Sequence, residues 1–402
     1  MNVVKKYELK EVINVSGTMT ALGSSSVPPE VIEAMVDVLP RFVDMVHLQQ
    51  QACRVIRRVI SAEAGCVTSC AAAGIAISVA ACMTGADLAK VEQLPDTTGL
   101  KNEVIIQKGH VVWFGASVPQ MVRLTGAKVV EIGDATRAGT YQLEGAINEN
   151  TAAALYVVSH HTVQYGLISL EEFCRVAHAH GIPVVVDAAS ESNMSSFVER
   201  GADLVCFSGH KFLAGPTSGI IAGRKDLVEA CLFHQYHGIG RAMKVGKEGI
   251  VGVMAALERW ERLDHKAVQA EQERIIDKFV EGLKDIPGLA VTVEPDPTGN
   301  PIRRVKVQVD PEVVGLTAFE ISAELAAGDP PVIVRDHHVI DEGFFFLDPC
   351  NVTVEQAEIV VEAIRRIIDL PDEQKKMIRG RYPRWPNHAD LLVEKLKGWV
   401  PK

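Results

Sequence analysis

One lysine of this chain stands where a lysine is costly to place. Lys211 follows the apolar run 202–208 and precedes a turn of small residues, within the stretch LVCFSGHKFLAGPTSG. Burial disfavours the ammonium form of a lysine and so yields a neutral, nucleophilic amine. Such an amine can form a covalent bond with a carbonyl group. Lys211 is therefore a candidate nucleophile.

Asp187 ends a neighbouring apolar run, 182–189, and precedes Lys211 by 24 residues. Ligands of open α/β sheets bind at the carboxyl ends of the strands, so the two side chains are predicted to lie close together. A lysine amine and a carboxylate facing a pyridinium nitrogen are the groups that pyridoxal 5'-phosphate (PLP) requires. An ordinary salt bridge at a strand end is the alternative, and the pair alone does not decide between the two.

A third stretch has the composition of a phosphate-binding turn. In VTSCAAAG, residues 67–74, the hydroxyl side chains of Thr68 and Ser69 precede very small residues that open a helix-like segment. The free N–H groups and the dipole of a helix N-terminus favour a bound anion. Any small-residue helix start has this composition, so the stretch gains weight only from its combination with Asp187 and Lys211.

The elements that must position these residues alternate between strand and helix patterns. Helix-like segments lie between several of the apolar runs, for example 169–181, which has Ser169 as its N-cap and Gly181 at its end. This order predicts an α/β domain with a mostly parallel sheet covered on both faces. The six runs rich in Val and Ile that we expect to be its strands are 103–107, 127–133, 153–159, 182–189, 202–208 and 218–224.

The C-terminal third has a different pattern. One long helix is predicted over 247–285, followed by a smaller α+β domain with an antiparallel sheet and a final helix over 353–369. We expect an N-terminal segment over 1–25, a large domain over 26–255 and a small domain over 256–402. The strands expected in the small domain are 288–295, 303–310, 330–336 and 343–349.

Composition excludes several classes of function. The net charge of −10 over 402 residues and the lack of a basic stripe argue against a nucleic-acid partner. Eight cysteines without a CxxC pair indicate reduced thiols in the cytoplasm, and the N-terminus has no apolar core of a signal peptide. Residues 64–86 carry no charge, but they are mostly small, so a helix packed inside the α/β domain is expected rather than a membrane span.

With these residues in place, the chain resembles fold-type I PLP-dependent enzymes of the selenocysteine synthase-like group. Within that group it is most similar to the D-glucosaminate-6-phosphate ammonia-lyases. The resemblance implies a large PLP-binding domain, a smaller C-terminal domain, and a homodimer or larger homo-oligomer with shared active sites. The stretches that carry it are INVSGTMTALGSSSVPPEV, EAGCVTSCAAAGIAISVAACMTG, LPDTTGLKNEVIIQKGH, VVVDAASE, SGHKFLAGPTSG, GRAMKVGKEGIVGVMAALE and GDPPVIVRDH.

The resemblance also implies roles for single residues. Lys211 resembles the lysine that forms a Schiff base with PLP, and Asp187 resembles the partner of the pyridinium nitrogen. His110 falls where this fold often stacks a ring on the cofactor, although a buried core histidine is the alternative. The residues implied to contact the cofactor phosphate or its surroundings are Ser69, Cys70, Ala71, Ser208 and His210.

The remaining implied residues concern the substrate. Arg335 falls where these enzymes hold a substrate carboxylate through a bidentate pair. His160 and His161 end a strand at the carboxyl edge and are candidates to contact the substrate; no spacing of further ligands suggests a metal. The basic cluster of Arg241, Lys244 and Lys247 suits a substrate phosphate, or the PLP phosphate of a neighbouring subunit.

The implied reaction is α,β-elimination on a 2-amino-2-deoxy-gluconate-type acid, with or without a 6-phosphate, to a 2-keto-3-deoxy acid and ammonia. The alternatives are a PLP-dependent racemase, aldolase or lyase acting on another small amino acid, and a catalytically silent PLP-binding protein. Selenium transfer to a tRNA is not expected, because INVSGT begins at residue 13 without the preceding tRNA-binding region. One departure from the family is the turn Ser-Cys-Ala, where Ser-Gly-Ala is more usual, since the Cys70 side chain could crowd a phosphate.

Overall fold

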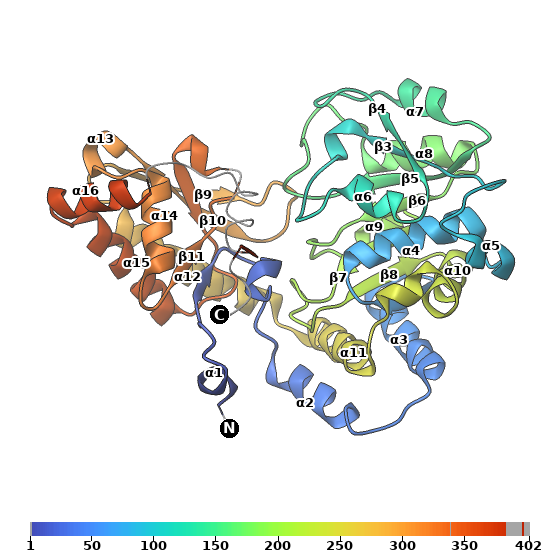
Figure 1. Ribbon diagram of the computed structural model, residues 1–402, viewed down its shortest axis with the longest axis horizontal. Helices are drawn as coiled ribbons and strands as arrows, with labels where there is room; N and C mark the ends of the chain where they lie inside the picture. The colour runs from blue at the N-terminus through green and yellow to red at the C-terminus, as the bar shows by residue number, and fades with distance from the viewer. Residues whose placement is uncertain (1, 338, 383–395, 398–402) are drawn as a thin grey trace. The chain divides into compact units, whose positions relative to one another are not determined.

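The computed structural model describes residues 2–337, 339–382 and 396–397. Its chain divides into two compact units (Figure 1). The large unit comprises residues 24–263 and 297–300, and the small unit comprises residues 1–23, 264–296 and 301–402. These units differ from the expected domains in that the N-terminal segment groups with the C-terminal part of the chain. The short stretch 297–300 groups with the large unit.

A seven-stranded sheet forms the centre of the large unit, in the order β2-β8-β7-β6-β5-β3-β4. Neighbouring strands from β4 to β7 pair in parallel, and β8 pairs antiparallel with both β7 and β2. The predicted α/β class with a mostly parallel sheet is confirmed, and each of the six expected runs contains a strand. The strands are β2 (Ala64–Thr68), β3 (Glu103–Gln107), β4 (Lys128–Ile132), β5 (Thr151–Val157), β6 (Val184–Asp187), β7 (Leu204–Ser208) and β8 (Gly219–Gly223).

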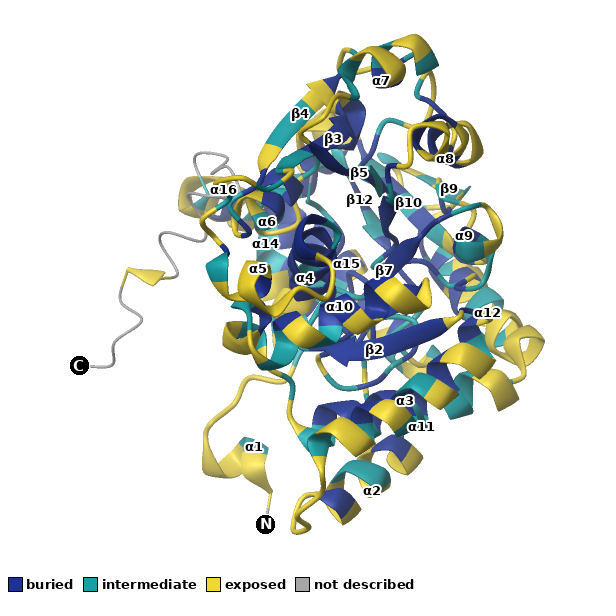
Figure 2. Cartoon of the chain, turned by 90° about the vertical axis from the view of Figure 1, so that its right-hand side faces the viewer, coloured by how far each residue is buried: buried dark blue, intermediate teal, exposed yellow. Residues whose placement is uncertain are grey.

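Helices cover both faces of this sheet because its strands are apolar on both sides. In β6, Val184 and Val186 pack in one hydrophobic cluster and Val185 packs in the other. Figure 2 shows the buried strands between helices whose outer surfaces are exposed. The helices of this unit are α2 (Pro29–Val38), α3 (Met45–Ile60), α4 (Ala71–Thr84), α5 (Leu88–Gln93), α6 (Val118–Arg123), α7 (Thr140–Ala146), α8 (Leu170–Ala179), α9 (Ser196–Glu199), α10 (Lys225–Tyr236) and α11 (Lys247–Arg262).

The uncharged segment 64–86 forms both a strand and a helix. Its first residues form β2, which the sequence analysis did not separate from the helix, and α4 begins at Ala71. Small residues let α4 approach the sheet, since a Cβ added at Gly74 would lie 3.3 Å from the Cys206 sulfur. Among the described residues, no helix combines the length and the apolar character needed to cross a membrane.

Two of the predictions for the C-terminal third were wrong in detail. The expected long helix is two helices, because the Asp264 side chain caps the N–H groups of Lys266 and Ala267 and starts α12 there. The expected strand 330–336 lies outside the antiparallel sheet β12-β10-β9, since β11 pairs in parallel with β1. The elements of the small unit are α1 (Val3–Lys6), β1 (Ile13–Val15), α12 (His265–Leu283), β9 (Leu289–Pro295), β10 (Arg303–Val309), α13 (Pro311–Val314), α14 (Ala318–Ala327), β11 (Val332–Val334), β12 (Phe344–Leu347), α15 (Val354–Ile368) and α16 (Asp372–Arg381).

Candidate active site

Lys211 and Asp187 lie at the carboxyl edge of the seven-stranded sheet. Asp187 is the last residue of β6 and pairs with Cys206 of the adjacent parallel strand β7, beyond which Lys211 follows. The Asp187 side chain is buried, and its Oδ1 accepts a hydrogen bond from the backbone N–H of Ala189 at 3.2 Å. Burial raises the pKa of Asp187 to about 6, and the nearby positive charge of Lys211 acts in the opposite direction. The two side chains are therefore close enough to interact electrostatically.

The turn before α4 reaches the same edge. The strand-end residues Thr68, Gly219 and Ser208 occupy one row across β2, β8 and β7. Gly219 allows this close approach, because a Cβ there would lie 2.3 Å from the carbonyl carbon of Cys70. The carboxyl ends of β2, β7 and β6 thus lie at one edge of the sheet, with the beginning of β8 between β2 and β7. This edge is where ligands of open α/β sheets bind.

Cys70 does not crowd this turn, because its side chain caps the helix. The Cys70 sulfur accepts from the N–H of Ala73 at 3.3 Å, and its carbonyl oxygen accepts from the hydroxyl of Thr68 at 2.9 Å. Helix geometry leaves the N–H groups of Ala71 and Ala72 without an intrahelical acceptor. These N–H groups of α4, together with the half-buried Ser69, form a site suited to an anion.

His110 is both a buried core residue and a residue of this edge. It follows β3, and its Nδ1 accepts from the backbone N–H of Val157 at 3.2 Å, so a neutral ring carries its hydrogen on Nε2. Its ring meets the edge of Tyr156 at 4.4 Å between centroids. Burial lowers the pKa of His110 to about 4, which keeps the ring uncharged at neutral pH.

Ser208 and His210 directly precede Lys211 in the chain. The Nδ1 of His210 lies 3.3 Å from the carbonyl oxygen of Ser218 and must donate to it, since a carbonyl only accepts. Burial lowers the pKa of His210. The carbonyl oxygen of His210 accepts from the Ser25 hydroxyl at 2.8 Å, and the backbone N–H of Ser208 bonds to Ala189. Both residues therefore fix the backbone that carries Lys211.

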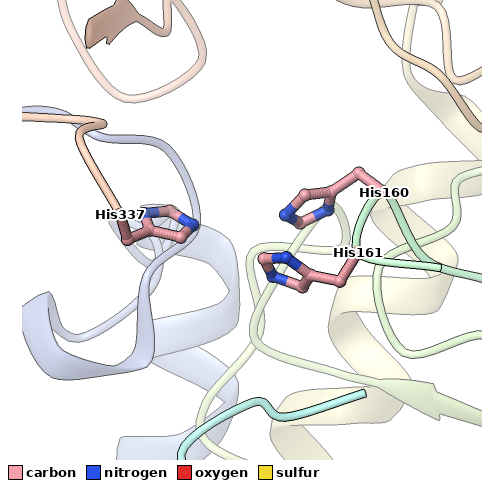
Figure 3. A group of neighbouring side chains, drawn as sticks. All are labelled: His160, His161 and His337. Carbon is pink, nitrogen blue, oxygen red and sulfur yellow. The ribbon is translucent and has the colours of Figure 1, made fainter. Parts of the chain in front are cut away.

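His160 and His161 lie in the turn that follows β5 (Figure 3). Their rings are 3.8 Å apart between centroids with an interplanar angle of 47°. The backbone N–H of His161 donates to the Ser159 hydroxyl at 3.2 Å. Both side chains are half-buried at the carboxyl end of a strand next to β6, which is the edge that the sequence predicted for them.

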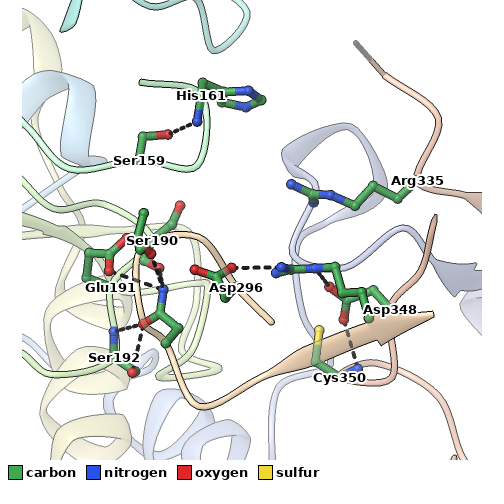
Figure 4. A network of polar contacts seen from close by, with 12 residues as sticks. Ser159, His161, Ser190, Glu191, Ser192, Asp296, Arg335, Asp348 and Cys350 are labelled. Atoms are coloured by element: carbon green, nitrogen blue, oxygen red, sulfur yellow. Dashed lines mark hydrogen bonds and ion pairs between the residues drawn. The ribbon is translucent and has the colours of Figure 1, made fainter. Parts of the chain in front are cut away.

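Arg335 belongs to the small unit, where it follows β11. It is 9% exposed, and its Nη1 donates to the carbonyl oxygen of Ser16 at 3.3 Å. Burial lowers the pKa of Arg335, and the charge of Arg304 acts in the same direction. Arg304 itself bonds both Asp296 and Asp348 at 2.7 Å (Figure 4). A buried guanidinium balanced by nearby carboxylates has the chemistry to bind a carboxylate ligand.

The basic cluster has two different environments. Arg241 and Lys244 are exposed, in and directly after the 3-10 helix Ile239–Met243. Lys247 begins α11, where its ammonium donates to the carbonyl oxygen of Arg41 and lies 5.8 Å from the centroid of the Phe42 ring. Lys247 therefore stabilises the connection between α2 and α3, whereas the other two cations face solvent.

A polar network beside Lys211 was missed by the sequence analysis. The Lys211 ammonium donates to the Ser190 hydroxyl at 2.5 Å. Ser190 belongs to a loop that Asn300 contacts, and Figure 4 shows Ser190, Glu191 and Ser192 of this loop. The segment DAASES does show hydroxyl residues directly after Asp187. Asn300, by contrast, stands in a Gly- and Pro-rich turn where asparagine is ordinary, so nothing in the sequence marked it.

The fold is that of fold-type I PLP-dependent enzymes. A cysteine desulfurase from Escherichia coli matches with a TM-score of 0.55 at 17% identity, over 85% of this chain and 92% of that chain. An aspartate aminotransferase from Thermus thermophilus matches with a TM-score of 0.53 at 16% identity, over 91% and 94%. At these identities the likeness concerns the fold alone.

The chain belongs to the L-seryl-tRNA selenium transferase family, whose profile matches residues 12–286. It is 41% identical to the D-glucosaminate-6-phosphate ammonia lyase of Salmonella typhimurium, over 92% of this chain and 98% of the relative. A solved structure of D-glucosaminate-6-phosphate ammonia-lyase matches with a TM-score of 0.82, also over 92% and 98%. A 5'-C-glycyluridine monooxygenase-decarboxylase from a Streptomyces species is 37% identical, over 89% and 90%. The expected family resemblance is confirmed.

Proposed function

We propose that this chain is a PLP-dependent ammonia-lyase that acts on a 2-amino-2-deoxy-gluconate-type acid. The observation that carries the proposal is the 41% identity to an ammonia lyase over nearly the full length of both chains. The placement of Lys211 and Asp187 at one sheet edge supports it, because an enzyme of this class needs both groups.

The residues at this edge fit PLP. Lys211 would hold the cofactor covalently, and Asp187 would face its ring nitrogen, where a positive partner offsets the cost of ionising a buried carboxyl. When bound, PLP supplies an electron sink for negative charge at the substrate α carbon. The first turn of α4 would hold the phosphate through Ser69, Cys70 and Ala71. Ser208, which shares the strand-end row of Thr68 and Gly219, would lie nearby. His110 and His210 would border the cofactor.

The chain's own residues would carry out the proton transfers. Lys211 is the base for the α proton, because an amine held at the reacting carbon becomes available once the substrate is bound. The candidates to protonate the departing 3-hydroxyl are His160, His161 and Lys211 itself. Water leaves from carbon 3, and is regained when the nitrogen leaves carbon 2 as ammonia, so the 2-keto-3-deoxy acid and ammonia together balance the substrate.

Positively charged side chains would bind the two anionic groups of the substrate. Arg335 would bind the carboxylate at carbon 1, which a planar guanidinium can contact through two hydrogen bonds. The exposed Arg241 and Lys244, with Lys247, suit a phosphate at carbon 6. We further propose that the protein works in the cytoplasm as a homodimer or larger homo-oligomer with shared active sites.

A second candidate function is oxygen-dependent decarboxylation, because the Streptomyces relative bears that activity in its name and is 37% identical. The two reactions differ in what they consume and release. An ammonia-lyase needs no oxygen and releases no carbon dioxide. The outcome with and without oxygen therefore separates the two candidates.

The test is to incubate the PLP-loaded protein with D-glucosaminate 6-phosphate, with and without oxygen, and to measure ammonia, keto acid and carbon dioxide. We expect equal amounts of ammonia and keto acid under both conditions. Lys211→Ala should lower this rate by roughly 10²–10⁴-fold, since it removes the proposed base and the covalent anchor. The exposed Lys225→Ala serves as the matched control. Oxygen-dependent release of carbon dioxide would favour the second candidate, and PLP binding without any product would indicate a silent binding protein.

A further inference from the structure

We propose that Asn300 and Glu191 are positioning residues that hold Ser190 against the Lys211 amine. The proposal rests on the function proposed above only in that Lys211 is taken as the reactive lysine. Ser190 accepts the Lys211 ammonium hydrogen at 2.5 Å. Its loop follows β6 and contains no regular secondary structure. Backbone hydrogen bonds from Glu191 to Ala188 and from Ser208 to Ala189 hold its first part, and side-chain contacts add to them.

Asn300 provides those contacts on three consecutive residues. Its Nδ2 donates to the carbonyl oxygen of Ser190 at 3.2 Å and to Oε2 of Glu191 at 3.1 Å. Its Oδ1 accepts from the backbone N–H of Ser192 at 2.9 Å and from the Ser192 hydroxyl at 2.8 Å. The same nitrogen also lies 3.0 Å from the Thr298 hydroxyl. One amide thus holds the loop through both its donor and its acceptor atoms.

Glu191 fixes which way this amide points. Its carboxylate is 9% exposed and accepts from the Thr298 hydroxyl at 3.1 Å as well as from Asn300. An ionised carboxylate can only accept, so the amide nitrogen must face Glu191 and the amide oxygen must face Ser192. The same amide nitrogen also donates to the carbonyl oxygen of Ser190.

Asn300 can reach this loop because its own segment groups with the large unit. Residues 297–300 belong to the compact unit that contains Lys211, although the chain on both sides belongs to the small unit. Gly299 adopts φ +85°, a backbone conformation that glycine adopts more readily than other residues, and this lets the chain turn between β9 and β10. Residues 297–300, which connect β9 to β10, therefore contact the Ser190 loop. Asn300 and Ser190 are 110 residues apart in the sequence.

The test measures the reactivity of Lys211 itself. The full chain without added cofactor is treated with trace acetic anhydride, and acetylation of the Lys211 peptide is followed by mass spectrometry across a pH series. A hydrogen bond from the ammonium to Ser190 favours the charged, unreactive form. Ser190→Ala should therefore speed labelling at fixed pH by roughly three- to tenfold, the effect of one hydrogen bond. Asn300→Ala and the near-isosteric Asn300→Asp should give a similar change.

A variant that combines Ser190→Ala with Asn300→Ala tests whether Asn300 acts on Lys211 through Ser190 or independently of it. If Asn300 acts through Ser190, adding Asn300→Ala to Ser190→Ala changes the labelling rate no further. The matched control is Asn148→Ala, because Asn148 also bridges a glutamate and backbone groups in the large unit but lies next to the amino ends of β3 and β5. The proposal would be overturned if the two substitutions changed the labelling rate of Lys211 by factors that multiply. It would also be overturned if the Asn300 variants lowered the melting temperature without changing the labelling rate. Labelling needs no substrate, so this result is independent of whether the protein is an ammonia-lyase.

Discussion

Asp187 is a buried carboxyl group, and its ionisation lowers the folding stability of the cofactor-free protein. Its pKa is raised to about 6 by burial, against about 3.9 in an unfolded chain. The folded protein therefore binds more protons than the unfolded chain between these values, and stability falls as the pH rises through this window. A bound pyridinium would relieve that cost, so the instability of the cofactor-free protein is linked to the function proposed for the site.

Asp187→Asn should stabilise the cofactor-free protein at pH 7.5 while weakening the binding of PLP. The gain is at most about 3 kcal/mol, because two pKa units correspond to roughly that free energy. Urea unfolding at pH 7.5 and pH 4.5 measures it, and the difference from the unaltered protein should shrink at the lower pH. Asp285→Asn, at an exposed site of the small unit, should show no such pH-dependent difference. A gain of equal size at both pH values would contradict the role of burial.

Among the secondary-structure elements, β8 and the start of α4 pack closely together at the proposed phosphate site. It requires Gly219, since an added Cβ would lie 2.3 Å from the Cys70 carbonyl carbon and 2.5 Å from the Thr68 hydroxyl. Both neighbours are held in place, one by the helix and the other by the strand β2. The first turn of α4 is thus positioned by a contact between elements and not by its own sequence alone.

Gly219→Ala should displace this turn and weaken the binding of PLP at least tenfold, with a loss of stability of roughly 1–3 kcal/mol from overpacking. An absorbance titration with PLP and a thermal melt measure the two effects. Gly145→Ala is the control, because nothing lies within 4 Å of a Cβ there and alanine is favoured in a helix. A Gly219→Ala protein with unchanged PLP affinity would argue against a phosphate site at α4.

For the whole molecule, the relevant feature is a group of exposed apolar residues that lie close together in the sequence. It follows α2 and the connection to α3, where Phe42 is fully exposed. Contiguous exposed apolar residues are typical of surfaces that contact another protein. The residues of this surface are Ile32, Val36, Leu39, Phe42, Val43 and Val46. We propose a second copy of the chain as the partner, in line with the homo-oligomer proposed above.

Phe42→Asp should therefore reduce the mass of the protein in sedimentation or light scattering toward that of a single chain. A charge placed at the centre of an apolar contact loses hydration without gaining a partner. Tyr141→Asp, at another exposed aromatic residue in α7, should leave the mass unchanged. A Phe42→Asp protein that keeps the mass of an oligomer would place the subunit contact elsewhere.

The class of fold and the pairing of Asp187 with Lys211 follow from local patterns in the sequence. Alternation of short apolar runs with helices predicts a covered parallel sheet, and the ends of adjacent parallel strands must meet at one edge. That rule pairs Asp187 with Lys211 from the sequence alone. The sequence also identifies Ser169 as a helix N-cap, and in the structure its hydroxyl accepts from the backbone N–H of Glu172. These predictions depend on local pattern and regular geometry alone.

Tertiary contacts, in contrast, determine which further side chains join the candidate site. The cap formed by Cys70, the pairing of β1 with β11 and the contact of Asn300 with Ser190 all join residues whose types have ordinary alternatives. A sulfur, a short apolar run or a turn asparagine becomes specific only through its neighbours. Hydrogen bonds between distant segments depend on packing to within a few tenths of an ångström, and no periodic pattern in the chain encodes that distance.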